Sequence, residues 1–374
     1  MPYLESSFTP TTGSTIMIKT TSSSFFNNEV TLTDGTTTLT SSFDADGVCI
    51  FSNVFLTGEL TASSVNGSNV IKEKINIPHV GATIMRNAIV ASTTLNDNDW
   101  STIQAIAKKG SGELYWNVGD RKAVTFNGVI NSYLTLSNYT CYAYILGFNH
   151  NQEKEGTAIH FQIGFTALTG GVHIGFSDDV NNYVRDKQGF NMNPGPYSGG
   201  TNAGGWASCG MRTVIMPALK AAMPSALQSV LKAVTKYSDN VGGTSIGDIP
   251  SNISTTQDEI FLASVYEKLG PLINTNNPNV PSGYSNTTSY YKYINHSEYA
   301  DGKQKQYKYY ENGNDLNAYK HNYTNTGLAD WSRSIALNSS EQFIKFSSGY
   351  PDRSYYDKSH SGYDCGIAPI FAVG

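Results

Sequence analysis

Short runs of alternating β-branched and polar residues, separated by turn-forming residues, constrain most strongly how the first part of this chain can fold. The runs Glu29–Thr33 and Thr36–Thr40 flank the pair Asp34-Gly35. An Asp-Gly pair between two such runs predicts a β-hairpin, because a type I′ turn requires positive φ at both central residues. No helical pattern interrupts the short runs between residues 15 and 78, so this region is predicted to consist of strands.

A second turn signal follows at Asp44-Ala45-Asp46-Gly47, between Ser42-Phe43 and the apolar run Val48–Phe51, and it predicts a second hairpin. An Asp-x-Asp-Gly sequence also occurs in calcium-binding loops, but the glutamate that completes such a loop does not follow at the required distance, which favours a simple turn. Several short strands in a region of this size predict a small immunoglobulin-like β-sandwich over residues 1–80.

After Pro78 the pattern changes to a mixture of helices and strands, which predicts an α+β domain over residues 81–374. A short amphipathic helix is predicted after the N-cap Asp99, with Gly110 as its stop signal. The other predicted helices are Trp206–Ala222, a helix from Pro224 through Val234, and a helix from a capping box at Thr256 towards Gly270. The predicted buried strands are Lys122–Phe126, Cys141–Phe148 and Ala158–Phe165.

A long polar insertion interrupts the predicted domain at residues 271–327. It is rich in Asn, Tyr, Ser and Lys and has little hydrophobic periodicity. Segments of this length inside a compact domain usually contact partners or are partly disordered.

The charge balance of the chain excludes several classes of partner. The 374 residues carry 25 Lys and Arg against 30 Asp and Glu, a net charge of −5, so the basic field that nucleic acid binding needs is missing. The first residues lack the pattern of a signal peptide, and no apolar stretch approaches the roughly 20 residues of a membrane span. The chain is therefore predicted to be made in a cytoplasm, without membrane insertion and without a nucleic acid partner.

The residues that could carry catalysis or bind metal do not form a convincing pattern. One candidate acid–base or metal group is His150, Glu153, Glu155 and His160, but these residues flank a polar, lysine-containing turn, which favours a solvated loop. Asp178-Asp179 could supply half of a glycosidase pair, yet no second carboxylate can be assigned. The cysteines are too far apart for a zinc or redox motif and are predicted to be buried free thiols: Cys49, Cys141, Cys209 and Cys365. The sequence thus predicts no catalytic residue, no metal site and no cofactor.

The best candidate for a binding surface is a polar, tyrosine-containing run near the C-terminus, bracketed by apolar anchors. The anchors are Trp331, Phe343–Phe346 and Gly366–Val373, and Phe343–Phe346 and Ile367–Val373 are predicted to be core strands. Tyrosine supplies rigid amphipathic area and short polar side chains supply adaptable hydrogen bonds, as in antibody paratopes, although an irregular polar loop has a similar composition. The predicted ligand-binding residues are Asn338, Ser339, Ser340, Ser347, Tyr350, Asp352, Arg353, Ser354, Tyr355, Tyr356, Asp357, Ser359, His360, Tyr363 and Asp364.

Several motifs downstream of residue 84 carry a resemblance to a known family. They are Asp99-Trp100, Tyr115–Asp120, Leu146–His150, Gly205–Ser208 with Met211-Arg212, Trp331-Ser332-Arg333-Ser334 and Gly366–Val373. Together they resemble C-type-lectin-fold variable proteins diversified by diversity-generating retroelements, and the phage and gut-bacterial domains that end in Trp-x-Arg-Ser and Gly-x-x-Pro-x-Phe-x-Val. One departure is Asp330, which precedes Trp331 where the family often has a second aromatic residue.

The resemblance implies a C-type-lectin-like ligand-binding domain over residues 81–374, with residues 1–80 as an anchoring or spacer domain. It implies a phage tail or virion receptor-binding protein, made in the host cytoplasm, whose variable C-terminal surface attaches to a bacterial cell-surface protein or glycan. Other virion proteins and further copies of the chain, for instance in a trimer, are the expected partners. The alternatives are a structural decoration or fibre protein without variable binding and, less favoured, an enzyme that degrades cell-wall glycan.

Overall fold

The computed structural model describes residues 12–132, 134–164, 167–168, 171–172, 190–193, 201–243, 249–270, 294–311, 329–337, 339–347, 350–352 and 365–374. Contacts divide the chain into two compact units, Met1–Trp116 and Asn117–Gly374, called here the N-terminal and the C-terminal unit. The chain contains many strands and several short helices, in agreement with the predicted α+β class. Among the described residues, no helix combines the length and the apolar character needed to cross a membrane.

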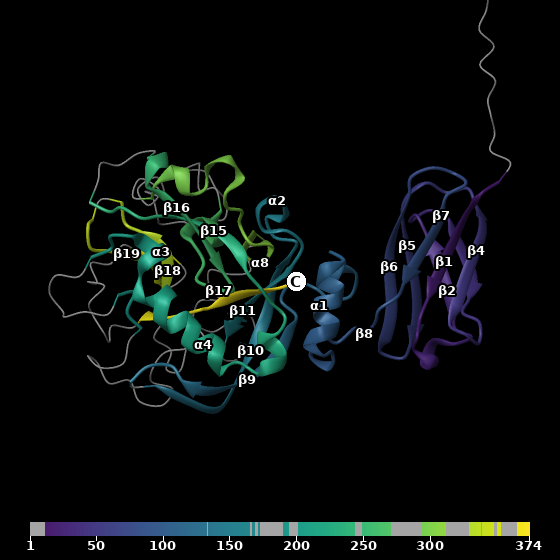
Figure 1. The fold of residues 1–374 in the computed structure, drawn as a ribbon, viewed down its shortest axis with the longest axis horizontal. Coiled ribbons are helices and arrows are strands. Elements are labelled where there is room, and N and C mark those ends of the chain that lie inside the picture. The colour runs from purple at the N-terminus through teal and green to yellow at the C-terminus, as the bar shows by residue number, and fades with distance from the viewer. Residues whose placement is uncertain are drawn as a thin grey trace, which may run out of the picture. The chain divides into compact units, whose positions relative to one another are not determined.

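Two sheets form the N-terminal unit (Figure 1), and their strand orders are β4-β1-β7 and β3-β2-β5-β6-β8. Alternate side chains of the two sheets share one core, for example Ile16 and Ile18 of β1, Leu32 of β2 and Ile75 of β6. This burial of every second residue is the expected result of the period-2 pattern. The strands are β1 (Ser14–Lys19), β2 (Glu29–Thr33), β3 (Thr38–Ser42), β4 (Val48–Val54), β5 (Gly58–Asn66), β6 (Asn69–Ile77), β7 (Thr83–Asn87) and β8 (Val90–Ser92).

The hairpin predicted around Asp34-Gly35 is confirmed, but its loop is longer than the two-residue turn. β2 and β3 pair from Glu29↔Ser42 to Thr33↔Thr38. The Asp34 carboxylate accepts hydrogen bonds from the backbone N–H groups of Thr36 and Thr37, at 2.8 and 2.6 Å. These bonds close the loop through a side chain, which a rule based on the Asp-Gly pair alone does not anticipate.

The second predicted hairpin is wrong, although its turn exists. The Asp44 carboxylate accepts hydrogen bonds from the backbone N–H groups of Asp46 and Val48, so Asp44–Gly47 is a turn, as the sequence favoured. The strands on either side of the turn belong to different sheets, because β3 pairs with β2 and β4 pairs with β1. The turn therefore carries the chain from one sheet to the other.

The N-terminal unit extends beyond the predicted boundary at residue 80. β7 pairs with β1 and β8 pairs with β6, so both strands complete sheets of this unit. The predicted helix after Asp99 is confirmed as α1 (Trp100–Lys108). The indole Nε1 of Trp116 donates a 3.0 Å hydrogen bond to the carbonyl of Ser92, and the Tyr115 hydroxyl donates one of 2.7 Å to that of Lys72. The strand pairings and the Tyr115–Lys72 bond agree with the division after Trp116, which places residues 81–116 in the N-terminal unit.

The C-terminal unit contains a six-stranded sheet with the order β14-β22-β11-β10-β9, in which β17 also pairs with β22. The last strand, β22, is buried along its whole length and pairs antiparallel with β11, β14 and β17. The prediction of a C-terminal core strand is thus confirmed. The strands are β9 (Arg121–Val129), β10 (Thr135–Phe148), β11 (Ile159–Gly164), β14 (Leu231–Lys232), β17 (Ile260–Phe261) and β22 (Ile370–Val373).

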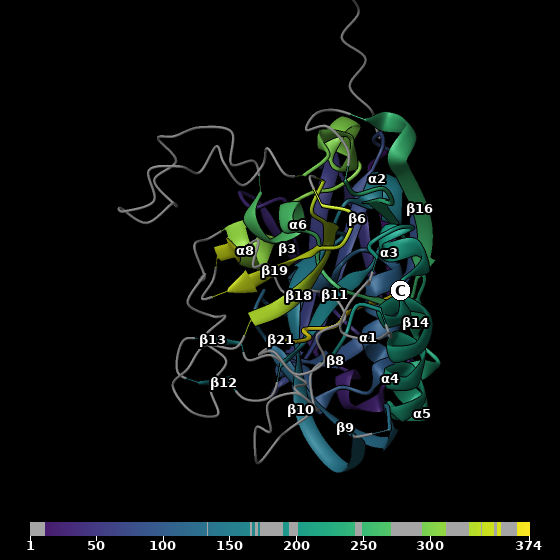
Figure 2. The same cartoon turned by 90° about the vertical axis from the view of Figure 1, so that its left-hand side faces the viewer.

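A second, four-stranded sheet of this unit has the order β20-β19-β18-β21. β18 (Ala329–Ile335) lies antiparallel to β19 (Phe343–Ser347), and Figure 2 shows the two side by side. β20 (Tyr350–Asp352) pairs antiparallel with β19, whereas β21 (Cys365–Gly366) lies parallel to β18. The remaining strands pair as β15 (Val234–Asp239) with β16 (Ile253–Asp258) and as β12 (Ala167–Leu168) with β13 (Gly171–Val172).

Three helix predictions in the C-terminal unit need correction. The helix Trp206–Ala222 is interrupted by the non-helical Cys209. The helix predicted from Pro224 through Val234 ends at Gln228, because Leu231 and Val234 begin strands that pair with β22 and β16. Pairing within a sheet here outweighs apolar residues at helical spacing. The helices are α2 (Gln152–Glu155), α3 (Gly205–Ser208), a π-helix (Met211–Ile215), α4 (Met216–Ala222), α5 (Ser225–Gln228), α6 (Val265–Leu269) and α8 (Lys308–Glu311).

The capping box predicted at Thr256 is also wrong. Thr256 lies in the middle of β16, and the box instead starts α6. The Ser264 hydroxyl accepts a hydrogen bond from the N–H of Glu267, whose carboxylate accepts one from the N–H of Ser264. The capping box is therefore formed by Ser264 and Glu267, three residues after β17, and not by Thr256 and Glu259.

Candidate functional site

The predicted ligand-binding run is attached to the four-stranded sheet. Ser339 and Ser340 lie in the turn between β18 and β19, and the β19–β20 pair brings Ser347 opposite Tyr350. Residues 353–364 follow β20 and precede β21, and both strands belong to this sheet. The sheet is called here the frame sheet. It holds both ends of the segment that contains most of the predicted contact residues.

The structure describes only part of the predicted binding residues. Ser339 is half-buried and Ser340 is exposed, while Ser347, Tyr350 and Asp352 belong to β19 and β20. The other predicted contact residues lie outside the described part of the chain: Asn338, Arg353, Ser354, Tyr355, Tyr356, Asp357, Ser359, His360, Tyr363 and Asp364.

Buried Asn202 holds the Ser339–Ser340 turn in place. Its side-chain amide donates hydrogen bonds of 2.8 and 3.0 Å to the carbonyls of Ser339 and Gln342, and its backbone N–H donates one of 3.0 Å to the carbonyl of Ser340. Gly242 contacts the same turn so closely that a Cβ atom there would lie 2.0 Å from the Ser339 carbonyl oxygen. The turn therefore has one defined conformation relative to the body of the C-terminal unit.

The motif Trp331-Ser332-Arg333-Ser334 forms the buried part of β18. All four residues are at most 2% exposed. The Trp331 indole donates a hydrogen bond to the carbonyl of Phe190, and the Arg333 guanidinium donates one of 2.9 Å to the carbonyl of Leu262. This motif supports the frame sheet and does not itself face a ligand.

Asp330, the residue that departs from the family pattern, also lies in the core. Its carboxylate pairs with the ammonium group of Lys268, and both side chains are at most 2% exposed. The Lys268 ammonium group also lies 4.1 Å from the centre of the Phe346 ring. The Lys268 ammonium group thus contacts both β18, through the Asp330 carboxylate, and β19, through the Phe346 ring.

A continuous series of buried ion pairs ends at Arg333 of the frame sheet. The Lys236 ammonium group is 2.8 Å from a Glu155 carboxylate oxygen and 3.0 Å from one of Glu267. The other oxygen of Glu267 accepts hydrogen bonds from Arg333 and, at 3.0 Å, from the N–H of Ser264. Glu155, Lys236, Glu267 and Arg333, called here the polar core, link α2, β15, α6 and β18.

Burial and partners shift the pKa values of the two polar-core carboxylates in opposite directions. Burial opposes ionisation of Glu267, but Arg333 and Lys236 outweigh it and hold its pKa below the usual range. Burial raises the pKa of Glu155 to about 7, because only Lys236 makes a close ion pair with it among the described cations. Glu155 is thus the member of the polar core whose negative charge is least compensated by its partners.

Two histidines lie next to Glu155, in a region that the sequence predicted to be a solvated loop. His150, Glu155 and His160 are all buried, and of the four residues considered there only Glu153 is exposed. The prediction was wrong because β10 and β11 pair on either side of α2, which turns Glu155 inward. The signal in the sequence was His160, which stands inside the apolar run Ala158–Phe165.

Tyr307 covers both histidines. Its hydroxyl is 3.1 Å from Nδ1 of His160, and its ring stacks on that of His150 with centres 3.8 Å apart. Burial lowers the pKa of His150 to about 3 and also lowers that of His160, so both rings are neutral at physiological pH. Stacked neutral rings and a buried hydroxyl form a compact polar layer against the polar core.

Tyr307 belongs to the predicted polar insertion, part of which is therefore built into the core. Within residues 294–311, Gln304 accepts a 2.6 Å hydrogen bond from the Ser264 hydroxyl and donates one of 2.8 Å to the carbonyl of Tyr237. The Ser334 hydroxyl donates a 3.1 Å hydrogen bond to buried Glu298. The prediction that the whole insertion contacts partners or is partly disordered is therefore corrected for residues 294–311, which pack into the C-terminal unit.

The chemistry available at these buried groups is limited by their partners. Cys49, Cys141 and Cys209 are buried free thiols, as predicted, and burial raises the pKa of Cys209 to about 12, which makes it a poor nucleophile. Cys365 begins β21, and the Asp178-Asp179 pair lies outside the described residues.

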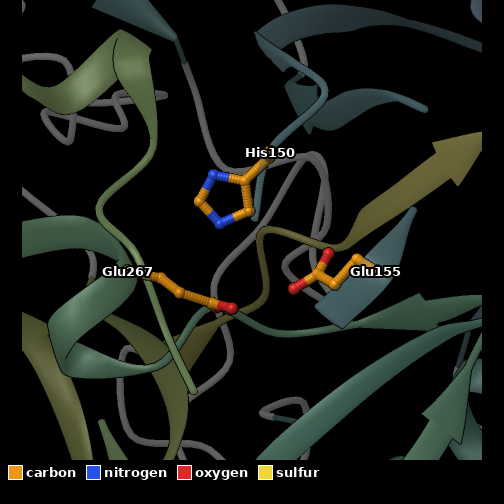
Figure 3. A group of neighbouring side chains, drawn as sticks. All are labelled: His150, Glu155 and Glu267. Carbon is orange, nitrogen blue, oxygen red and sulfur yellow. The ribbon is translucent and has the colours of Figure 1, made fainter. Parts of the chain in front are cut away.

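His150, Glu155 and Glu267 each offer one ligand atom, and these atoms lie within 4.8 Å of one another (Figure 3).

Strand pairing brings together the two motifs that carry the resemblance at the end of the chain. β18, which contains Trp331–Ser334, runs parallel to β21 with Ala329 opposite Cys365 and Asp330 opposite Gly366. The Gly366–Val373 motif then continues into β22 of the six-stranded sheet. The sequence of this chain matches no protein-family model and no curated protein.

Proposed function

We propose that this chain is a phage virion or tail protein that binds a receptor on the bacterial surface through the run between Asn338 and Asp364. In this proposal the C-terminal unit is a C-type-lectin-like domain, and the N-terminal unit is an immunoglobulin-like spacer that joins it to other virion proteins. The motifs Trp331–Ser334 and Gly366–Val373 support the assignment of the domain.

The observation that carries the proposal is the attachment of the polar run to a buried frame. β20 and β21 flank residues 353–364 in the sequence and are strands of one sheet. The strand between β21 and β19, β18, is fixed by the Arg333 ion pair and by the Trp331 hydrogen bond. A surface whose residues vary from copy to copy requires such a scaffold, because the scaffold must fold whatever the loop contains.

The composition of the run indicates how it would bind. Tyr355, Tyr356 and Tyr363 offer flat aromatic faces, which stack on sugar rings or fill pockets in a protein receptor. The serine and aspartate side chains between them provide hydrogen bonds at the rim. No catalytic residue, metal or cofactor takes part in this binding.

Adsorption to bacteria tests the proposal. The fluorescently labelled full-length chain should bind saturably to cells of a host strain, and the unlabelled chain should compete for the same sites. A structural decoration or fibre protein would instead bind virions that lack it and would leave all bacterial strains unlabelled. An enzyme that acts on cell-wall glycan would release soluble sugar from the cells.

The DNA beside the gene provides a second test, specific to variability of the run. A reverse-transcriptase gene and an adenine-rich near-copy of the segment encoding the run are expected there. If both are missing, receptor binding remains proposed but diversification of the run is rejected.

A further inference from the structure

Three buried, ligand-type atoms on neighbouring side chains lie beside the polar core. They are Nε2 of His150, Nε2 of His160 and Oε2 of Glu155, and none of them has a hydrogen-bond partner among the residues that the structure describes. Nε2 of His160 lies 3.4 Å from Oε2 of Glu155. Figure 3 shows the imidazole of His150 turned towards the carboxylates of Glu155 and Glu267.

Leaving these atoms without a partner is costly. A buried polar atom that loses its partner destabilises a protein by about 1–3 kcal/mol, and more if it is charged. The residues are 6% exposed or less, so bulk water does not compensate this cost. A ligand that contacts all three atoms would remove it.

The separation between the His160 and Glu155 atoms matches a metal site. In a tetrahedral site with ligand bonds of about 2.0–2.2 Å, neighbouring ligand atoms lie roughly 3.4 Å apart. The observed 3.4 Å between His160 and Glu155 has this value, and the ligand atoms of His150 and Glu155 lie within 4.8 Å. Two imidazoles and one carboxylate form a ligand set typical of Zn²⁺, whereas Ca²⁺ and Mg²⁺ prefer oxygen ligands.

The groups behind the ligand atoms orient them for this role. Nδ1 of His160 is 3.1 Å from the Tyr307 hydroxyl, so an Nδ1–H donor to Tyr307 leaves the lone pair of Nε2 directed at Glu155. The second oxygen of Glu155 is held by Lys236 at 2.8 Å. Lys236 therefore occupies Oε1 and leaves Oε2 open.

The polar core beside these atoms pairs two buried carboxylates, Glu155 and Glu267, with two buried cations, Lys236 and Arg333. Glu267 uses both of its oxygens for Lys236, Arg333 and Ser264, so it contributes charge and not a ligand atom.

We propose that His150, His160 and Glu155 bind one divalent transition-metal ion, with Zn²⁺ as the best match. The ion would connect the end of β10, α2 and β11 and, through Tyr307, the stretch 294–311. Because the site is enclosed, its role is to stabilise the C-terminal unit. The proposal does not depend on receptor binding.

Metal binding by the full-length chain tests this proposal. The purified protein is stripped with a chelator, dialysed against Zn²⁺ or Co²⁺, and analysed for bound metal. We expect one ion per chain, a visible absorption spectrum of tetrahedral Co²⁺, and a higher melting temperature with Zn²⁺, because the ion binds only the folded state. Glu155→Gln and His160→Gln should each weaken metal binding by more than about 10-fold, because loss of a ligand costs more than loss of a residue that only orients a ligand, for which about 10–100-fold is typical.

Matched controls separate this site from adventitious binding. Glu153→Gln changes the exposed neighbour of Glu155, and His79→Gln removes an exposed histidine of the N-terminal unit. Both should keep one ion per chain. Glu155→Gln conserves shape, so it reports on the site even if His160→Gln fails to fold. The proposal is overturned if the wild-type chain binds no stoichiometric ion, or if Glu155→Gln binds the ion as tightly as the wild type.

Discussion

At the residue scale, Arg333 connects β18, which precedes the proposed binding run in the sequence, to the buried ion pairs of the polar core. Its guanidinium donates to Glu267 and to the carbonyl of Leu262, and the side chain is fully buried. Removal of one partner from a buried ion pair leaves the other charge uncompensated, and that loss exceeds the gain from the pair itself.

Replacement of Arg333 by methionine should therefore lower the free energy of unfolding by about 3–5 kcal/mol, measured by urea denaturation. The exposed pair Lys308–Glu311 provides the control, since Lys308→Met should cost less than about 1 kcal/mol. The double variant Arg333→Met with Glu267→Leu should recover part of the loss. Equal effects of Arg333→Met and Lys308→Met would contradict the assigned role of the polar core.

Glu298 should make stability depend on pH. Burial raises its pKa to about 8, from an ordinary value of 4.5, so the folded state favours the protonated carboxyl group. The resulting stabilisation is complete below pH 4.5 and is lost as the pH rises through about 8. Glu298→Gln should reduce the difference between the free energies of unfolding at the two ends of this range. Exposed Glu311→Gln should leave that difference unchanged, and the same result for Glu298→Gln would reject the assignment.

At the element scale, the turns of the N-terminal unit show which sequence signals suffice. Alternation and Asp34-Gly35 predicted the β2–β3 hairpin correctly, because both strands pair locally. The turn at Asp44–Gly47 was predicted but its strand pairing was not, since β4 pairs with β1, about 30 residues earlier in the chain. Local patterns identify strands and turns but not the partner of a strand.

Gly47 and Gly35 provide a matched test of close packing at a turn. Both have positive φ, 73° and 95°, so alanine strains the backbone at each position. A Cβ atom at Gly47 would lie 2.2 Å from the Thr20 carbonyl oxygen, whereas at Gly35 no described atom lies within 4 Å. Gly35→Ala should cost about 1 kcal/mol and Gly47→Ala clearly more, in urea denaturation followed in the N-terminal unit. Equal losses would mean that the close contact at Gly47 has no energetic effect.

The candidate site was predicted only in part for a similar reason. The apolar anchors Phe343–Phe346 and Gly366–Val373 identified strands beside the proposed binding run, and both stretches contain buried strand residues. The group His150, Glu155 and His160 was noticed but interpreted as solvated, because sequence does not reveal that Lys236 and Tyr307 cover it. Buried polar groups depend on partners far away in the chain, which composition and periodicity do not report.

At the scale of the whole molecule, the C-terminal unit assembles segments that are distant in sequence. β22, at the end of the described chain, pairs with β11, β14 and β17, so the segment after the proposed binding run is anchored in the six-stranded sheet. The division of the chain after Trp116 assigns this entire framework to one unit. Receptor binding by residues 338–364 is therefore proposed as a property of a surface supported by the rest of the C-terminal unit.

The most direct test compares two pairs of adjacent tyrosines. Tyr355 and Tyr356 belong to the proposed binding run, whereas Tyr309 and Tyr310 are at most 9% exposed. Tyr309→Ala with Tyr310→Ala should cost about 3 kcal/mol or more of stability, as expected for core aromatics. Tyr355→Ala with Tyr356→Ala should change stability by less than about 1 kcal/mol and weaken adsorption of the full-length chain to host bacteria by about 2 kcal/mol, roughly 30-fold in Kd. If that variant unfolds while adsorption per folded molecule is unchanged, these tyrosines are packing residues and the proposed function is contradicted.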